Sequence, residues 1–243
     1  MLTAAGAIAA CRAVIFDCAG TLLHLNPSPE RIFQDSAREL GVALELGEIV
    51  RAYESVNFSL QIKSSKATTR TEREAFYASF NGALCMALGI HRSFDRLHPL
   101  LLSRFVERRA WVAFEDAAAT LAALGKHRAV HALANWDRNL SLVLERAGLR
   151  SLVGDAAASE ELGAEKPARA CFDAFLSRNA LDPADAVYVG NEYIADVVGA
   201  RQAGLTPILV DRDNRLPHAD CLRVRSLLEL TLAAHAYSDR EPR

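Results

Sequence analysis

The first residue whose position suggests chemistry is Asp17, which directly follows the short apolar run Ala13–Phe16. A run of four apolar residues is typical of a fully buried strand. In an open parallel sheet, ligands bind beyond the carboxyl ends of the strands, so a carboxylate at this point is placed to meet a substrate. Gly20 follows three residues later and allows the chain to turn away sharply.

Three further groups of polar residues lie at the ends of predicted strands or at the starts of predicted helices. They are Ala134-Asn135-Trp136-Asp137, Glu165-Lys166-Pro167, and Gly190-Asn191-Glu192 with Asp196 in the helix start that follows. In a doubly wound sheet, the loops that carry these groups can converge around Asp17. A carboxylate nucleophile, a lysine that neutralises charge and a second carboxylate for a metal ion together suit phosphoryl transfer.

The apolar pattern predicts an α/β protein with a helical segment inserted after the first strand. Further strands are predicted at 129–134, 151–157, 186–189 and 207–210, with helices at 115–124, after Asp137, and at 168–178, 194–203 and 224–235. Alternating strands and helices imply a parallel sheet that is covered on both faces by right-handed crossovers. Between residues 24 and 109 the pattern predicts helices and no strand, and the first eleven residues are expected to be a loose start.

The composition excludes several classes of protein. The chain has 243 residues, of which 51% are hydrophobic and 24% charged, as in soluble globular proteins. The net charge of −2, without a basic run, gives nucleic-acid binding no electrostatic support, and no apolar stretch is long enough to cross a membrane. Five scattered cysteines without a CxxC pair suggest reduced thiols, so we expect a cytoplasmic protein acting on a small molecule.

The order of these motifs resembles the haloacid dehalogenase-like hydrolase superfamily. The matching residues are Asp17 and Thr21, then Asn135, then Lys166-Pro167, then Gly190 and Asp196 followed by Gly199-Ala200. The helical insert is similar to the C1 cap of subfamily I. The resemblance covers residues 12–230, and it implies a Rossmann-like core at 1–23 and 110–243 with an all-helical cap at 24–109.

The resemblance also implies a role for each matching position. Asp17 would attack the substrate and form an aspartyl ester, usually an aspartyl phosphate. Lys166 would hold the nucleophile and the transferred group by its charge. Thr21 would steady the loop that turns at Gly20, and Asn135 would be the nearest side-chain donor to the transferred group. All three residues are expected to bind the substrate phosphate.

Magnesium is the cofactor that the resemblance implies, because Mg²⁺ prefers oxygen ligands and one or two carboxylates plus phosphate suffice. The expected ligands are Asp17, the backbone carbonyl of Ala19, Asn191 and Asp196, with Glu192 added if its loop turns inward. The ion and the catalytic lysine would offset the repulsion between an anionic nucleophile and an anionic substrate.

Three positions depart from the phosphatase pattern of the family. Ala19 stands where those phosphatases carry a second Asp as general acid/base, and losing such a group typically costs ~10²–10⁴-fold in rate. Ala134 replaces a Ser or Thr that binds the transferred group. Asn191 replaces an Asp, so a metal site at this position carries less charge. The changes weaken proton transfer, phosphate binding and metal binding, while the nucleophile and the lysine remain.

The leading hypothesis is therefore hydrolysis of a small phosphorylated metabolite through an aspartyl phosphate on Asp17, with Mg²⁺ in a weakened site. A metal-independent hydrolase of the dehalogenase kind is the second, since haloacid dehalogenases lack the second Asp and attack carbon. A catalytically weakened homologue that binds a ligand or partner is the third. Structural roles also stay open, because Asp17 and Asn135 could cap turns and Asp196 could favour a helix start.

Overall fold

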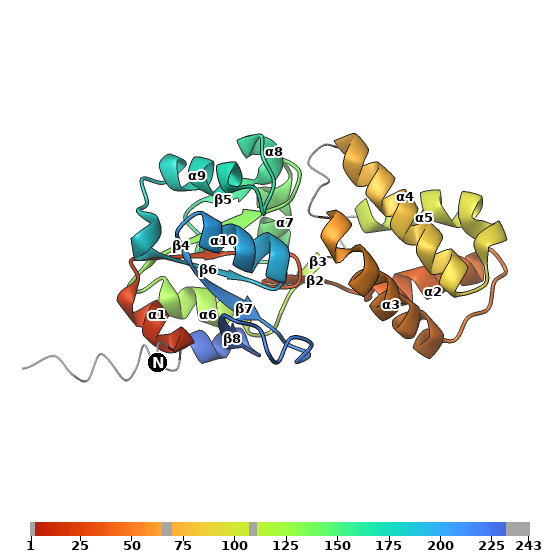
Figure 1. The fold of residues 1–243 in the computed structure, drawn as a ribbon, viewed down its shortest axis with the longest axis horizontal. Coiled ribbons are helices and arrows are strands. Elements are labelled where there is room, and N and C mark those ends of the chain that lie inside the picture. The colour runs from red at the N-terminus through yellow and green to blue at the C-terminus, as the bar shows by residue number, and fades with distance from the viewer. Residues whose placement is uncertain (1–2, 65–69, 107–110, 232–243) are drawn as a thin grey trace, which may run out of the picture. The chain divides into compact units, whose positions relative to one another are not determined.

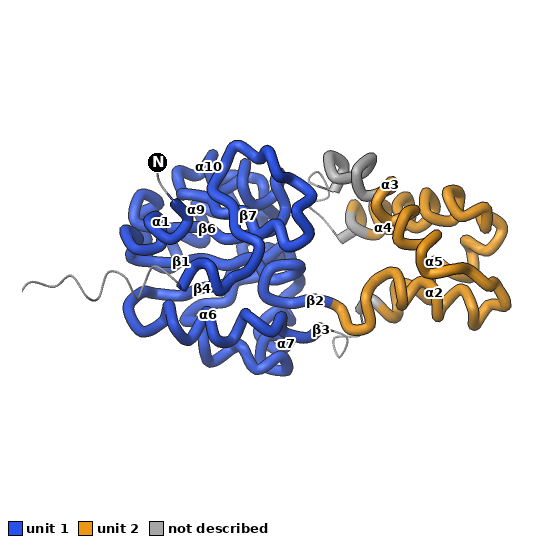
Figure 2. Tube along the Cα trace, turned by 90° about the horizontal axis from the view of Figure 1, so that it is seen from below, with its two compact units in different colours: residues 1–24, 112–243 blue, residues 25–111 orange. Residues whose placement is uncertain are grey.

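The structure, a computed structural model, describes residues 3–64, 70–106 and 111–231 (Figure 1). The chain divides into two compact units, one of residues 1–24 and 112–243 and one of residues 25–111 (Figure 2). Within the described part of the chain, no helix combines the length and the apolar character needed to span a bilayer.

A six-stranded parallel sheet forms the centre of the first unit. Its strands are β1 (Ala13–Phe16), β4 (Ala129–Ala134), β5 (Ala156–Ala158), β6 (Ala186–Gly190), β7 (Thr206–Val210) and β8 (Leu222–Val224), in the order β5-β4-β1-β6-β7-β8. Each neighbouring pair is parallel. The strand order runs outward in both directions from β1, which confirms the predicted doubly wound, Rossmann-like sheet and places a topological switch point at β1.

Helices cover this sheet on both faces, as its sequence pattern predicts. They are α1 (Ala4–Ala10), α6 (Ala117–Leu124), α7 (Leu140–Arg146), α8 (Ser159–Leu162), α9 (Arg169–Arg178) and α10 (Gly199–Gln202), together with the 3₁₀ segments η3 (Arg150–Leu152), η4 (Pro183–Asp185) and η6 (Leu227–Leu230). A single π-helical turn, η5 (Tyr193–Val198), precedes α10. Side chains alternate across a strand, so successive buried residues of β1 face opposite helical layers.

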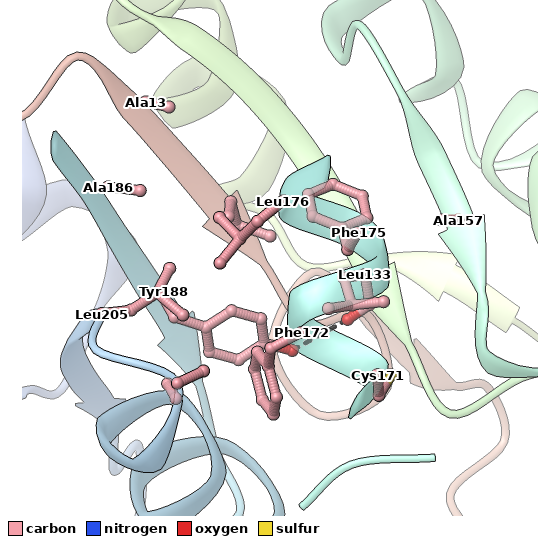
Figure 3. Packing of buried hydrophobic residues seen from close by; sticks show 13 residues of the cluster. Ala13, Leu133, Ala157, Cys171, Phe172, Phe175, Leu176, Ala186, Tyr188 and Leu205 are labelled. Atoms are coloured by element: carbon pink, nitrogen blue, oxygen red, sulfur yellow. Dashed lines mark hydrogen bonds between the residues drawn. The ribbon is translucent and has the colours of Figure 1, made fainter. Parts of the chain in front are cut away.

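One of the two core layers lies between the sheet and α9 (Figure 3). Phe172 and Phe175 of α9 are almost fully buried against Ile15 of β1 and Tyr188 of β6. The rings of Phe172 and Tyr188 meet edge to face, with centroids 5.2 Å apart. This packing fixes β6 against α9, and both elements carry site residues at their ends.

The second unit is helical and has a core of its own. It contains α2 (Pro29–Glu39), α3 (Leu46–Ser64), α4 (Arg70–Ala87), the short η1 (His91–Ser93) and α5 (Phe94–Val106). Ser28 accepts a hydrogen bond from the Arg31 backbone amide and Pro29 follows it, which are the residue types favoured at the cap and the first position of a helix. Tyr53 packs edge-on against Phe33 and Phe80 inside the core.

Two predictions about strands and loops were wrong. Residues 24–109 were expected to hold no strand, but β2 (Leu23–Leu25) pairs with β3 (Trp111–Ala113) as a separate two-stranded sheet. Strands of three residues are too short to show an alternating pattern. The loose start was also wrong, because α1 is capped by Thr3, whose hydroxyl accepts from the Gly6 amide.

The predicted helix at 224–235 is also not observed in the described residues. The chain forms the edge strand β8 and then η6, whose Leu227 and Leu230 are both buried. Apolar residues three positions apart suit a 3₁₀ turn as well as an α-helix, so the spacing could not distinguish the two. The remainder of that prediction, from residue 232, lies outside the described residues. Likewise, the strand predicted at 151–157 is the shorter β5, preceded by η3.

Candidate active site

Asp17 lies at the carboxyl end of β1, in the middle of the sheet. Its backbone amide donates to the Val189 carbonyl at 2.8 Å, and the residue is 6% exposed. The chain then turns back at Gly20, which has φ +84°. A Cβ on Gly20 would lie 2.4 Å from Asn191 Nδ2, so both the backbone conformation and the available space require glycine.

The ammonium group of Lys166 is the centre of the site. Its Nζ donates to Oδ1 of Asp17 at 2.7 Å, to Oδ1 of Asp196 at 2.7 Å and to the Tyr188 hydroxyl at 2.8 Å. A lysine has three N–H donors, so all three have a partner here. Burial acts to lower the pKa of Lys166, but the charges of Asp17 and Asp196 outweigh it and hold the pKa well above its usual value. Lys166 therefore stays a cation.

Asn135, at the end of β4, holds the backbone of Lys166. Its Nδ2 donates to the Lys166 carbonyl at 2.9 Å, and its Oδ1 accepts from the Lys166 amide at 2.8 Å. This reciprocal pair ties the loop before α9 to the central sheet. The expected contact of Asn135 with a transferred group stays a prediction.

Asp196 belongs to the π-helical turn after β6 and is 1% exposed. Its Oδ1 accepts from Lys166, and its Oδ2 accepts from the Glu192 amide at 2.8 Å. Gly190 makes room for this carboxylate, since a Cβ there would lie 2.3 Å from Asp196 Cγ. Each oxygen of Asp196 thus accepts one hydrogen bond from the protein, and its expected role as a metal ligand stays a prediction.

Glu192 differs from Asp196 in being exposed to solvent. Partial desolvation, together with the negative charges of Asp196 and Asp17, nevertheless raises its pKa to about 7. Among the described residues, no hydrogen bond joins the Glu192 side chain to Asp17. The expected role of Glu192 as a metal ligand therefore stays a prediction.

The Asn191 side chain faces the nucleophile directly. Its inner amide atom lies 2.8 Å from the Ala19 carbonyl oxygen, 3.0 Å from Thr21 Oγ1 and 3.2 Å from Asp17 Oδ2. Amide oxygen and nitrogen are close in size, so the group fits here in two orientations. With the oxygen inward it accepts from the Thr21 hydroxyl, and with the nitrogen inward it donates to the oxygens around it.

The oxygen-inward orientation tests whether Mg²⁺ fits. Adjacent ligand oxygens of an octahedral Mg²⁺ ion are about 3.0 Å apart, given metal–oxygen bonds of about 2.1 Å. The separations of Asn191 Oδ1 from the Ala19 carbonyl and from Asp17 Oδ2 are close to that edge length. The donor set therefore fits Mg²⁺, with Asp17 as its one charged member. Among the described residues, no cluster of three or more His, Cys, Asp or Glu side chains could hold a metal.

The other two departures leave methyl groups where the family pattern has polar side chains. Ala19 is partly exposed beside the nucleophile and offers its backbone carbonyl, which lies next to the Asn191 amide. Ala134, at the end of β4, is 1% exposed. Neither side chain can move a proton or hydrogen-bond a phosphoryl group.

Tyr188 is a site residue that the sequence did not indicate. Its hydroxyl accepts from Lys166 Nζ. It donates to the Leu133 carbonyl at 2.8 Å (Figure 3). In the sequence it looks like one more core residue of a buried strand. Its hydroxyl group could have indicated a polar contact, because a buried tyrosine hydroxyl usually has a hydrogen-bond partner.

Arg212, just after β7, was also missed. Its guanidinium donates to the Thr21 carbonyl at 2.9 Å and makes two hydrogen bonds to Asp116, at 2.8 and 2.9 Å. It also stacks over the Phe114 ring, 3.9 Å from the centroid. Asp116 in turn accepts from Ser226 Oγ and the Leu227 amide. Residues this far apart in sequence carry no local signal of such a contact.

Comparison with known proteins connects this geometry to one family. The model of the haloacid dehalogenase-like hydrolases matches residues 11–204. A ribulose-1,5-bisphosphate 5-phosphatase of Halopiger xanaduensis is 31% identical over 206 residues, covering 82% of this chain and 84% of its own. Haloacid dehalogenase-like hydrolase domain-containing protein 3 of Danio rerio is 25% identical, covering 86% and 89%.

A solved structure has the same fold. The HAD-hydrolase YfnB of Bacillus subtilis, in a form bound to magnesium, superposes with a TM-score of 0.73 at 20% identity. The match covers 90% of this chain and 96% of that one. At 20% identity, this similarity shows a shared fold.

Proposed function

Because the chain belongs to the haloacid dehalogenase-like hydrolases, we propose that it removes phosphate from a small phosphorylated metabolite through an aspartyl phosphate on Asp17. The observation that carries this proposal is the 2.7 Å contact between Lys166 Nζ and Asp17 Oδ1 at the end of the central strand. Burial raises the pKa of Asp17 to about 6, while the charge of Lys166 acts to lower it, so the carboxylate is mostly ionised at neutral pH. The buried cation also favours the approach of a second anion. This combination suits a nucleophile for a phosphate ester.

In the first step, the Asp17 carboxylate attacks phosphorus and the bond from phosphorus to the ester oxygen breaks. The leaving oxygen takes its proton from water or from the substrate itself, because Ala19 has none to give. In the second step, water attacks the phosphorus of the aspartyl phosphate, inorganic phosphate leaves and the Asp17 carboxylate is restored. Lys166 offsets negative charge in both steps, and the turn at Gly20 and Thr21 holds the nucleophile in place.

Mg²⁺ would be held by Asp17 Oδ2, the Ala19 carbonyl and Asn191 Oδ1. When bound, it supplies positive charge that reduces the repulsion between the nucleophile and the phosphate. With one charged ligand in this set, affinity is expected to be lower than in a site with an Asp at position 191. The helical unit at 25–111 would serve as the C1 cap and supply side chains that select an anionic substrate.

The name of the Halopiger relative supports a phosphorylated substrate. A second candidate, the metal-independent hydrolase of the dehalogenase kind, is favoured by a different observation. With its nitrogen inward, Asn191 satisfies Asp17 Oδ2 and the Ala19 carbonyl without any metal. In that mechanism Asp17 attacks the carbon that carries the halogen and the carbon–halogen bond breaks, so halide leaves. Water then attacks the carbonyl carbon of the aspartyl ester, which releases the hydroxy acid and restores the Asp17 carboxylate.

One experiment separates the two mechanisms. The protein is screened against phosphorylated metabolites and 2-haloacids, with Mg²⁺ and with EDTA, and the best substrate is then turned over once in ¹⁸O-water. We expect Mg²⁺-dependent phosphate release with ¹⁸O in the phosphate. Activity that survives EDTA, with ¹⁸O in the Asp17 peptide, would establish the dehalogenase kind instead.

Asp17→Asn is the matched variant and is expected to abolish turnover in either mechanism. Turnover retained by this variant would exclude a covalent aspartyl intermediate altogether. Tight binding of a metabolite by the wild type without any turnover would instead support a ligand-binding homologue.

A further inference from the structure

We propose that the amide nitrogen of Asn191 takes the place of the cation in the metal-free protein, and that Mg²⁺ binds when this amide turns its oxygen inward. The proposal deepens the proposed function, on which its catalytic meaning rests. Its evidence and its test concern hydrogen bonding and metal binding around Asp17, and they do not involve turnover.

Two hydrogen-bond acceptors beside Asn191 need a donor or a cation between them. Asp17 Oδ2 and the Ala19 carbonyl oxygen lie 3.2 and 2.8 Å from the same inner atom of Asn191. Neither of these oxygens can donate a hydrogen bond. An amide oxygen facing both of them without a cation would be repelled, and all three oxygens would lack a shared partner. An amide nitrogen has two hydrogens, which suffice for the two acceptors.

Thr21 allows either orientation of the amide. Its hydroxyl lies 3.0 Å from the inner atom, and a hydroxyl both donates and accepts. It donates to an inward oxygen, or its lone pair shares one of the two hydrogens of an inward nitrogen with a neighbouring acceptor. The exchange therefore leaves Thr21 with a hydrogen bond in both states.

The space around Asn191 restricts the change to a rotation of the amide. Gly20 packs directly against it, since a Cβ at that position would lie 2.4 Å from Nδ2 and 2.8 Å from Cγ. A half-turn about the bond to the amide carbon exchanges nitrogen and oxygen while the side chain keeps its volume. No movement of the Gly20 turn is then needed to admit the ion.

A carboxylate at position 191 could not do this. Both of its terminal atoms are oxygens, so one of them would always face Asp17 Oδ2 and the Ala19 carbonyl. It would also add a negative charge to a site where two carboxylates, Asp17 and Asp196, already share one lysine. Asparagine thus provides hydrogen bonds to Asp17 Oδ2 and the Ala19 carbonyl when no metal is bound, but it lowers the affinity of the site for the metal.

The test compares the wild type with Asn191→Asp. Thermal unfolding is followed in EDTA and in Mg²⁺, and Mn²⁺ binding is measured by electron paramagnetic resonance. In EDTA, we expect the variant to unfold several degrees below the wild type. Mg²⁺ should raise the midpoint of the variant more than that of the wild type, and Mn²⁺ should bind the variant about tenfold more tightly, because ligand charge sets affinity.

Asn214→Asp is the matched control, because it makes the same chemical change at an exposed position where Arg223 donates to the side-chain oxygen. It should unfold like the wild type with and without Mg²⁺. The proposal is overturned if Asn191→Asp is as stable as the wild type in EDTA, since a carboxylate would then be tolerated without metal.

A measurement on the wild type covers the case in which the variant does not fold under either condition. The side-chain amide protons of Asn191, observed by ¹⁵N-edited NMR, should exchange slowly with water in EDTA and shift when Mg²⁺ is added. Fast exchange in EDTA, with no shift in Mg²⁺, contradicts the proposal. These readouts stand whether or not the protein hydrolyses phosphate esters, so failure of one proposal is distinguishable from failure of the other.

Discussion

Lys166 donates a 2.7 Å hydrogen bond to Asp17 from a side chain that is 2% exposed, and the Asp17 side chain is 9% exposed. The same ammonium makes an equally short contact with Asp196, also 2% exposed. One cation is therefore shared by two buried carboxylates. Such a group is stable as a whole, but removing one member leaves an uncompensated buried charge.

Lys166→Met should therefore destabilise the protein strongly. Two carboxylates would face each other without the cation, and loss of one partner from a buried ion pair typically costs ~3–5 kcal/mol. Urea unfolding at neutral pH measures the difference. Lys126→Met, at an exposed turn position, is the control and should change stability little. Equal stability of the two variants would show that the buried carboxylates are neutral without the lysine.

Tyr188→Phe should reduce turnover more than substrate binding. The change removes the partner of one Lys166 N–H and of the Leu133 carbonyl, which leaves buried groups unpaired at a cost of ~1–3 kcal/mol. With the ammonium less firmly held, we expect kcat to fall and KM to change little. Steady-state kinetics on the best substrate, beside urea unfolding, measures both effects.

Tyr53→Phe supplies the comparison for Tyr188. Tyr53 is also a buried tyrosine, but its hydroxyl donates to the Pro29 carbonyl at 3.4 Å inside the helical unit. Its removal should leave kcat unchanged. If both variants lower kcat equally, the effect of Tyr188 is general destabilisation and its contact with Lys166 has no separate part.

Ala19→Asp should raise phosphatase activity. The substitution restores a carboxyl group that can protonate the leaving oxygen and later activate water, an effect worth up to ~10²–10⁴-fold. Initial rates with an aryl phosphate and with an alkyl phosphate measure it, and the gain should be larger for the alkyl ester, whose leaving group is poorer. Ala19→Asn has nearly the same shape without the proton and should give no gain. Absence of a gain, or an equal gain in both variants, would mean that the site is not a weakened phosphatase.

Acid should remove the stabilising contribution of Asp116. Burial acts to raise its pKa, but hydrogen bonds from Arg212, Ser226 and the Leu227 amide outweigh burial and lower the pKa. A group whose folded pKa is lowered stabilises the protein fully above its unfolded pKa, about 3.9 for Asp. That contribution is lost as pH falls through the lower folded pKa.

Urea unfolding of the wild type and of Asp116→Asn between pH 7 and pH 3 measures the contribution of Asp116 to the free energy of unfolding. The wild type should be the more stable by a constant amount near neutrality, and the gap should narrow as pH falls below about 3.9. A gap that stays constant down to pH 3 would show that the folded and unfolded pKa values of Asp116 are the same.

The sheet and the convergence of polar loops at its carboxyl edge followed from the sequence. Asp17, Asn135 and Asn191 come directly after or within one residue of buried strands, so a parallel sheet brings them to one edge. Lys166 and Asp196 stand at helix starts that face the same edge. In the structure, the Lys166 ammonium lies within hydrogen-bond distance of both Asp196 and Asp17.

The partners of these residues did not follow from the sequence. The sequence did not indicate that the Asn135 amide holds the Lys166 backbone, because backbone groups offer no sequence pattern. The expected contact of Asn135 with a transferred group stays a prediction. Tyr188 was concealed by its apolar neighbours in β6. Arg212 and Thr21 are 191 residues apart in the sequence. No local pattern around either residue indicates that they are in contact. The strands β2 and β3 were too short to show any periodicity.

The contacts of Asp116 set a lower limit on the length of polypeptide that can hold the nucleophile turn. The family model ends at residue 204, but the Thr21 carbonyl is held by Arg212, and Arg212 is held by Asp116. Asp116 takes two further donors from Ser226 and Leu227. A chain shortened to the residues that the family model matches would keep Asp17 and Lys166. It would lose Arg212, Ser226 and Leu227, whose hydrogen bonds hold the turn that follows Asp17. Residue 227 is therefore the earliest end point at which this turn keeps all of its supports.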